Sequence, residues 1–141
     1  MSQYYEMGDQ TLWNPSNGAS QLFLGQVNLY EAVLGLPSGI GPMQADECQI
    51  DPAAFGVFAN ALLDWHCRTR HAVMTALSEG IVTAVLVLVE RAGIEVNWQP
   101  TDFAEVGDVR DVQVPTTPAF EAPRAAVLAQ KAHELGLSMA T

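Results

Sequence analysis

The segment that most constrains the fold of this chain is residues 81–89, Ile-Val-Thr-Ala-Val-Leu-Val-Leu-Val. It contains no charged side chain and is apolar on every side, so it belongs at the centre of the structure. Residues 90–93, Glu-Arg-Ala-Gly, are typical of a helix end with a glycine stop. We therefore predict a buried helix over residues 72–92. Two alternatives are a helical hairpin broken at Gly80 and a buried strand over residues 81–89.

A second helix has the clearest beginning in the chain. Asp51 is a strong N-cap residue, and Pro52 falls at the first helical position. Apolar residues then recur three and four positions apart, a spacing typical of a coiled-coil seam. We expect this seam to bind a partner helix, with Asp64 and Arg68 forming an i,i+4 ion pair on the opposite face. The principal seam side chains are Phe55, Phe58, Leu62 and Trp65.

The rest of the chain predicts two further helices and less ordered ends. A first helix is expected over residues 15–34, capped by Asn14 and stopped by Gly35. Residues 35–49 then form a loop between helices. The apolar positions of the first helix are Leu22, Phe23, Val27, Tyr30, Val33 and Leu34.

The fold class expected from these elements is all-α. We predict a small helical bundle, or a helical hairpin with additional helices and extended termini, as a single helical domain over residues 1–141. Its parts are an N-terminal arm (1–14), a helical core (15–98), a linker (99–122) and a C-terminal helix (123–137).

The charge distribution excludes several classes of partner. The formal net charge is −10, and the first Lys or Arg in the sequence is Arg68. Proteins that neutralise phosphates need clustered bases, so we expect no nucleic-acid partner. The run from residue 80 to residue 89 is about half the length needed to cross a bilayer, so we expect no membrane span. Residues 1–15 lack the pattern of a signal peptide. We expect synthesis in the cytoplasm, with any secretion using a route without a classical leader.

Candidate chemical groups gather only around one short stretch. Cys67 and His71 are four positions apart, which on one helix would place two metal ligands on the same face, with Asp64 or Cys48 as a third. The spacing matches no recognised zinc site, and nothing around His66 and Cys67 indicates a catalytic arrangement. We expect no metal, no cofactor and no enzymatic activity. Cys48 and Cys67 are compatible with two reduced thiols or with one disulfide.

Two short motifs resemble a known family. Residues 50–59, Ile-Asp-Pro-Ala-Ala-Phe-Gly-Val-Phe-Ala, resemble the helix start of the EspC-like and wider ESAT-6-like (WXG100-related) proteins of type VII (ESX) secretion. Trp98 and Asp102 resemble the family's secretion signal, an aromatic residue followed four positions on by an acid. Departures are the shorter spacing between the motifs, the missing Trp-x-Gly turn, Trp in place of Tyr, and Pro100 inside the signal. The resemblance covers residues 50–102 and implies a secreted helical protein that pairs with a partner.

Three functions follow as hypotheses. The first is a non-enzymatic helical interaction protein, a type VII secretion-associated substrate or partner that binds another helical protein or itself. The second is a structural or assembly component of a particle, such as a phage virion protein or an assembly adaptor that wraps its neighbours with its termini. The third is an enzyme with a hidden site around His66, Cys67 and His71.

Overall fold

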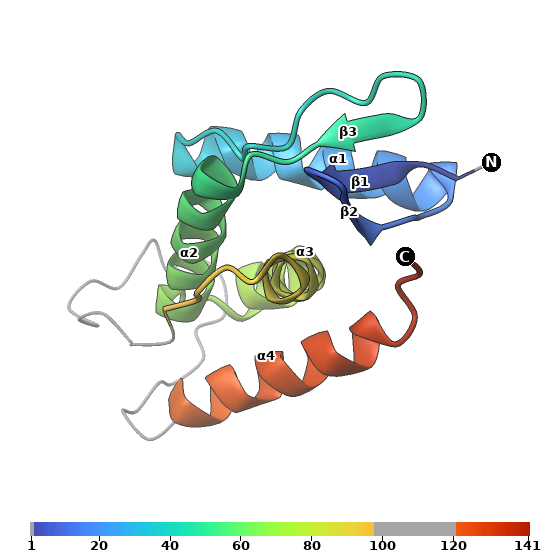
Figure 1. The fold of residues 1–141 in the computed structure, drawn as a ribbon. Coiled ribbons are helices and arrows are strands. Elements are labelled where there is room, and N and C mark those ends of the chain that lie inside the picture. Colours follow the sequence, from blue (N-terminus) through green and yellow to red (C-terminus); the bar gives the residue numbers. More distant parts are fainter. Residues whose placement is uncertain (1, 98–120) are drawn as a thin grey trace.

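The computed structural model describes residues 2–97 and 121–141, with side chains from residue 125 onward in the second range. In Figure 1, α3 lies in the middle, with α1 and a small sheet on one side of it and α4 on the other. The elements in chain order are β1 (Tyr4–Met7), β2 (Gln10–Trp13), α1 (Asn17–Leu34), β3 (Glu47–Gln49), α2 (Pro52–Arg68), α3 (Ala72–Ala92) and α4 (Glu121–Gly136).

The sheet corrects the predicted fold class. The expectation of an all-α fold is wrong, because the described residues contain a three-stranded mixed sheet of order β2-β1-β3 and the fold is mixed α/β. Residues 1–14 were expected to form an arm, but β1 and β2 pair there as an antiparallel hairpin. The two-residue turn is Gly8-Asp9, and Gly8 has a positive φ of 61° that glycine adopts without strain. Tyr5 and Leu12 are fully buried on the inner side of the hairpin.

The third strand comes from the predicted loop over residues 35–49. β3 pairs in parallel with β1, and Tyr5 lies opposite Cys48 in the register. Immediately after β3, the backbone N–H of Ile50 donates to the carbonyl of Glu6 at 2.8 Å. The pairing places the Cys48 side chain in the core, with 2% of its surface exposed.

The first helix begins two residues later than expected. Ser16, not Asn14, is the N-cap, and its Oγ accepts the backbone N–H of Ala19 at 3.3 Å. The backbone N–H of Asn14 donates instead to the carbonyl of Ala140 at 2.8 Å, which ties the start of α1 to the C-terminal residues. The predicted stop is confirmed, because Gly35 adopts the left-handed conformation at φ 67°.

The two predicted central helices are confirmed. Asp51 caps α2, with its Oδ1 accepting the N–H of Ala53 at 3.3 Å, and Pro52 is the first helical residue. α3 is one continuous helix, so the hairpin and strand alternatives are wrong, and Gly80 lies within it. Residues 81–89 are buried apart from a half-buried Ala84, as their composition requires. The predicted C-terminal helix is observed as α4.

An aromatic cluster joins the sheet to α1. Tyr5, Trp13 and Phe23 lie with ring centroids 5.2 to 5.6 Å apart, mostly edge to face. The hydroxyl of Tyr5 shares a buried 2.7 Å hydrogen bond with Ser20 Oγ on α1. These contacts fix which side of α1 faces inward, and so which side faces solvent.

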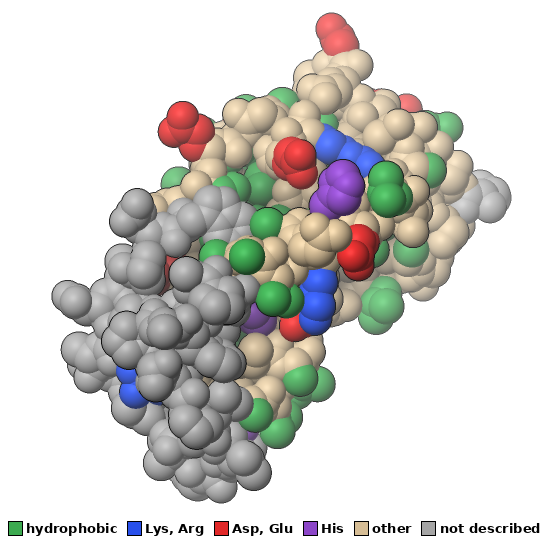
Figure 2. Space-filling model, turned by 90° about the horizontal axis from the view of Figure 1, so that it is seen from below, with side chains coloured by type: hydrophobic (Ala, Val, Ile, Leu, Met, Phe, Trp, Pro, Cys, Tyr) green, Lys and Arg blue, Asp and Glu red, His purple; other side chains and the backbone are tan. Residues whose placement is uncertain are grey.

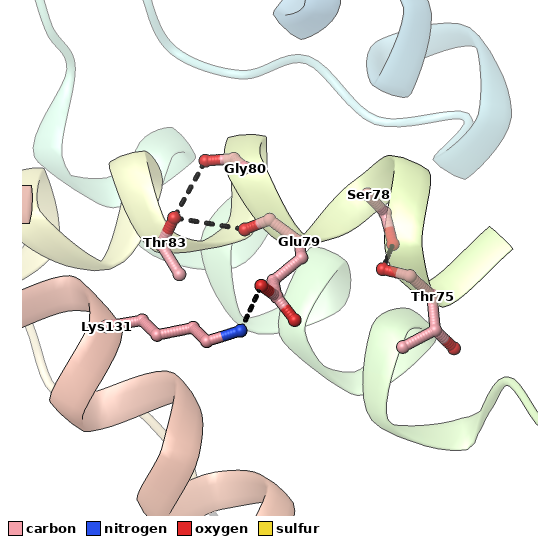
Figure 3. A network of polar contacts seen from close by, with 6 residues as sticks. All are labelled: Thr75, Ser78, Glu79, Gly80, Thr83 and Lys131. Atoms are coloured by element: carbon pink, nitrogen blue, oxygen red, sulfur yellow. Dashed lines mark hydrogen bonds and ion pairs between the residues drawn. The ribbon is translucent and has the colours of Figure 1, made fainter. Parts of the chain in front are cut away.

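Two polar ties hold α4 against α3. Lys131 of α4 pairs with Glu79 of α3, as Figure 3 shows. At the other end, the Arg91 guanidinium donates to the carbonyl of Leu12 at 2.8 Å and to those of Gly136 and Met139 at 2.9 and 2.8 Å. Arg91 therefore joins β2, α3 and the end of α4 through one side chain.

α3 also has the length and composition of a membrane-crossing helix, alone among the described helices. Its most apolar window has a mean hydropathy of 2.1, and half of that window is buried against the rest of the fold. A buried core helix meets the same criterion, so this property is weak evidence for a span.

Candidate functional site

The seam predicted to bind a partner lies inside the protein. Phe55 and Phe58 on α2 are fully buried, and Leu62 is 1% exposed. Trp65 is half-buried and packs edge to face on Tyr30 of α1, with ring centroids 5.4 Å apart. A partner binding this seam would have to displace the protein's own core, so an interaction surface must be sought elsewhere.

The predicted secretion signal lies outside the described residues. Trp98 and Asp102 both fall between residues 97 and 121. The signal, and the linker expected over residues 99–122 as far as residue 120, therefore stay predictions, while residues 121 and 122 belong to α4.

The group expected around Cys67 and His71 is divided between two helices. α2 ends at Arg68 and Thr69 is extended, so His71 is not on the same helix as Cys67. His71 instead caps α3, with its Nδ1 accepting the N–H of Met74 at 3.2 Å. Within residues 2–97 and 121–141, no three His, Cys, Asp or Glu side chains are grouped so that they could hold a metal ion. The predicted ion pair is confirmed, with Arg68 Nε 3.1 Å from Asp64 Oδ2.

A buried hydroxyl–imidazole pair is the nearest approach to catalytic geometry among the described side chains. His66 Nδ1 lies 2.6 Å from Ser78 Oγ, which donates to the carbonyl of Met74 at 2.7 Å. Ser78 is fully buried and His66 is 1% exposed, so a substrate cannot reach the hydroxyl. Burial raises the pKa of the adjacent Tyr30 phenol, and the side-chain hydrogen bond between Tyr30 and Ser78 partly opposes that shift. The pair belongs to the polar part of the core.

A small pocket opens between α3, α4 and the segment that follows α3. Its volume is about 270 Å³, slightly below the range usual for small-molecule sites. Six of its seven lining residues are apolar, and Glu90 is the one charged residue among them. The lining residues are Leu86, Val89, Glu90, Ile94, Val96, Ala129 and Ala132.

An organised apolar feature of the described surface lies on α1. Its side chains recur at helical spacing along the side of α1 that faces away from the core. Leu22, Leu29 and Val33 expose 67%, 57% and 49% of their surfaces. At 3.6 residues per turn these three lie within about 40° of one another around the helix axis. The α1 outer face, as we name it, consists of Gly18, Leu22, Gly25, Leu29, Ala32 and Val33, all exposed.

The opposite stripe of the same helix explains this exposure. Phe23, Val27 and Tyr30 are buried against the sheet, α2 and α3, which leaves the outer face no neighbour in the described fold. The two outer glycines add open space, because a Cβ at Gly18 or Gly25 would meet no atom within 4 Å. A partner backbone can therefore approach α1 closely at these points.

The α1 outer face is also uncharged in a strongly acidic protein. Glu31 is the one charged residue within α1, and its carboxylate accepts the N–H of Ser38 at 2.8 Å, on the far side of the helix from Leu29. Figure 2 shows the other side of the molecule, below α4, where acidic and basic side chains lie among scattered hydrophobic ones. A charge-free apolar stripe is the pattern expected of a surface that another protein covers.

Fold and surface together define a class, namely a small mixed α/β protein that presents an uncharged helix face to solvent. The chain belongs to the Family of unknown function (DUF6086), whose profile matches residues 1–141. Comparison with curated proteins and with solved structures finds no match. The resemblance to type VII secretion proteins therefore stays a prediction from residues 50–102.

Proposed function

We propose that this chain is a non-enzymatic interaction protein that binds a helical partner through the α1 outer face. The observation that carries the proposal is the exposed row of Leu22, Leu29 and Val33 on one side of a helix. Leaving three large apolar side chains in water forgoes about 1 kcal/mol or more each, which a partner recovers on binding. Scattered exposed leucines are ordinary, but an aligned row beside two glycines is not.

The buried state of the α2 seam supports the same choice of surface. Phe55, Phe58 and Leu62 already pack within the fold, so binding through them would expose a core in exchange for an interface. Binding through α1 needs no such rearrangement, because its outer face is already formed and open. The secretion and particle-assembly roles are more specific versions of this function, and each stays a prediction.

Site-specific photocrosslinking in the native cells tests the proposal. A photoreactive amino acid replaces Leu29 in one variant and Leu22 in a second, and both should give the same defined covalent adduct. The control carries it at Leu137, which is 80% exposed but lies beyond the end of α4. All three positions are solvent-facing leucines, so random collision labels them equally.

The adduct is then identified by mass spectrometry. One protein species enriched from the two α1 positions over the control supports the proposed function, whether that species is another protein or a second copy. Equal labelling at all three positions, or no adduct at α1, overturns it.

A further inference from the structure

We propose that the α1 outer face pairs with the same face of a second copy of this chain, as an antiparallel two-fold dimer. The proposal rests on the proposed function and names its partner. It is carried by the spacing of the exposed residues, by their lack of charge and by the positions of the two glycines.

The spacing of the outer face is self-complementary. In an antiparallel helix pair with two-fold symmetry, residues face each other when their numbers have a constant sum. With the axis between Gly25 and Gln26, Leu22 of each copy faces Leu29 of the other. The same axis places Gly18 of each copy opposite Val33 of the other.

One of these pairings matches a large residue with a small one, and the other joins two leucines. The space beside Gly18 is open, so it can accept the Val33 side chain from the second copy. Gly25 lies at the crossing point, opposite Gln26 of the other copy, and the missing side chain at Gly25 lets the two backbones come near each other there. The two leucine pairs then close over the crossing on either side. A parallel arrangement would instead place Gly18 against Gly18 and leave a gap there.

Charge favours this face for contact between copies. Each copy carries a formal net charge of −10, so most orientations of two copies bring acidic surfaces together. The α1 outer face contains no ionisable residue, and the Glu31 carboxylate is held on the other side by Ser38. Two copies can therefore meet here without placing like charges in the interface.

The area of the α1 outer face limits how tightly the two copies can bind each other. Residues 18–33 span about 22 Å along the axis, and a helix face is about 10 Å wide, so the pair buries on the order of 500 Å² in total. That is below the area of permanent dimers. We therefore expect a reversible dimer, populated at protein concentrations on the order of 100 µM and dissociating on dilution.

Analytical ultracentrifugation of the full chain over a range of concentrations tests the dimer. The parent should show a monomer–dimer equilibrium, and Leu29→Glu should weaken it at least about tenfold, because the added carboxylate enters an apolar contact. Leu137→Glu makes the same chemical change at another exposed leucine and should leave the equilibrium unchanged. A parent that is monomeric at all concentrations, or an equal effect of the two variants, overturns the dimer while the crosslinking result still decides the proposed function.

Disulfide trapping tests the antiparallel register in a Cys67→Ser background, where the remaining Cys48 is buried. Gly25→Cys, next to the two-fold axis, should form an intermolecular disulfide by itself under mild oxidation. Gly18→Cys alone should not, because the two copies of residue 18 lie about 22 Å apart, well beyond the roughly 7 Å limit between Cα atoms. A mixture of Gly18→Cys with Val33→Cys should trap the dimer. Self-trapping of Gly18→Cys would show a parallel pair and overturn the proposal.

Discussion

Cys48 illustrates how a single buried side chain responds to its surroundings. It lies on β3 in the core, and burial, together with the nearby Glu6 carboxylate, raises the pKa of its thiol from 9.0 to about 11. Across the β1–β3 pairing, burial raises the pKa of Tyr5 from 10.0 to about 12, against the effect of its hydrogen bond to Ser20. Both groups are neutral when protonated, so the fold favours their protonated forms.

We predict that the free energy of unfolding falls as the pH rises from about 9 to about 11. In that window the unfolded chain releases the Cys48 proton while the folded chain retains it, so alkali favours unfolding; below pH 9 this contribution is fully present. Urea titrations at about pH 8, 9 and 10 measure the slope. Cys48→Ala should flatten the slope between pH 9 and 10, and Tyr5→Phe should retain it there. An unchanged slope in Cys48→Ala would contradict the assignment.

At the scale of elements, two glycines have opposite roles. Gly39 lies before α2 with φ +77°, and a Cβ there would come within 2.7 Å of the backbone N of Phe55 and 2.8 Å of the carbonyl of Asp51. Gly80 lies on the exposed side of α3, and a Cβ there would meet nothing within 4 Å. One glycine makes room for the start of a helix, and the other only weakens a helix interior.

We predict that Gly39→Ala destabilises the protein by about 3 kcal/mol, because it combines backbone strain with a clash against atoms that cannot rotate away. Gly80→Ala should stabilise it by about 0.5–1 kcal/mol by restricting the unfolded chain and favouring the helix. Urea unfolding of the two variants beside the parent gives both values. Equal effects of the two substitutions would show that the conformation at Gly39 is not required.

Sequence patterns predicted the helices well because their signals are local. Asp51-Pro52 and Gly93 mark ends that depend on neighbouring residues only, and the composition of residues 81–89 requires burial. The hairpin also had a local signal, a Gly8-Asp9 turn between two short apolar and aromatic runs, which was interpreted as an arm. β3 had no such signal, since three residues became a strand through pairing with β1 some forty positions away.

The candidate site was missed for a different physical reason. Leu22 and Val33 were counted among the apolar positions of the first helix together with Phe23 and Val27, and α1 proves to be apolar on two sides. Periodicity shows that a helix has an apolar stripe, but it cannot show which of two stripes meets the core. That choice is made by Tyr5 and Trp13 of the hairpin, which pack on Phe23.

At the scale of the whole molecule, Arg91 connects elements that are distant in sequence. Its guanidinium spans three carbonyls, one on β2, one on the last residue of α4 and one three residues after it, and is partly buried there. A planar guanidinium with five donors can serve three acceptors at once, whereas an ammonium on a flexible stem cannot hold the same geometry.

We predict that Arg91→Lys lowers the free energy of unfolding by about 2–3 kcal/mol although the charge is retained, because carbonyls lose their donors. Lys131→Met removes the other tie between α3 and α4, a pair whose side chains are 46% and 34% exposed, and should cost less than about 1 kcal/mol. Urea unfolding of the two variants beside the parent gives the loss of unfolding free energy caused by each substitution. Hydrogen exchange should also rise in α4 of Arg91→Lys, and an equal cost for both variants would contradict the role of Arg91.

Net charge and the uncharged α1 outer face together determine how salt should act on self-association. Two copies carrying −10 each repel at long range, while the proposed contact contains no ion pair that salt could weaken. Raising the ionic strength from about 0.01 M to about 0.1 M shortens the Debye length from about 30 Å to about 10 Å and so screens only the repulsion. The dimer should therefore become several-fold tighter in ultracentrifugation, and Leu137→Glu should respond as the parent does. A dimer that weakens with salt would place the contact on charged surfaces away from α1.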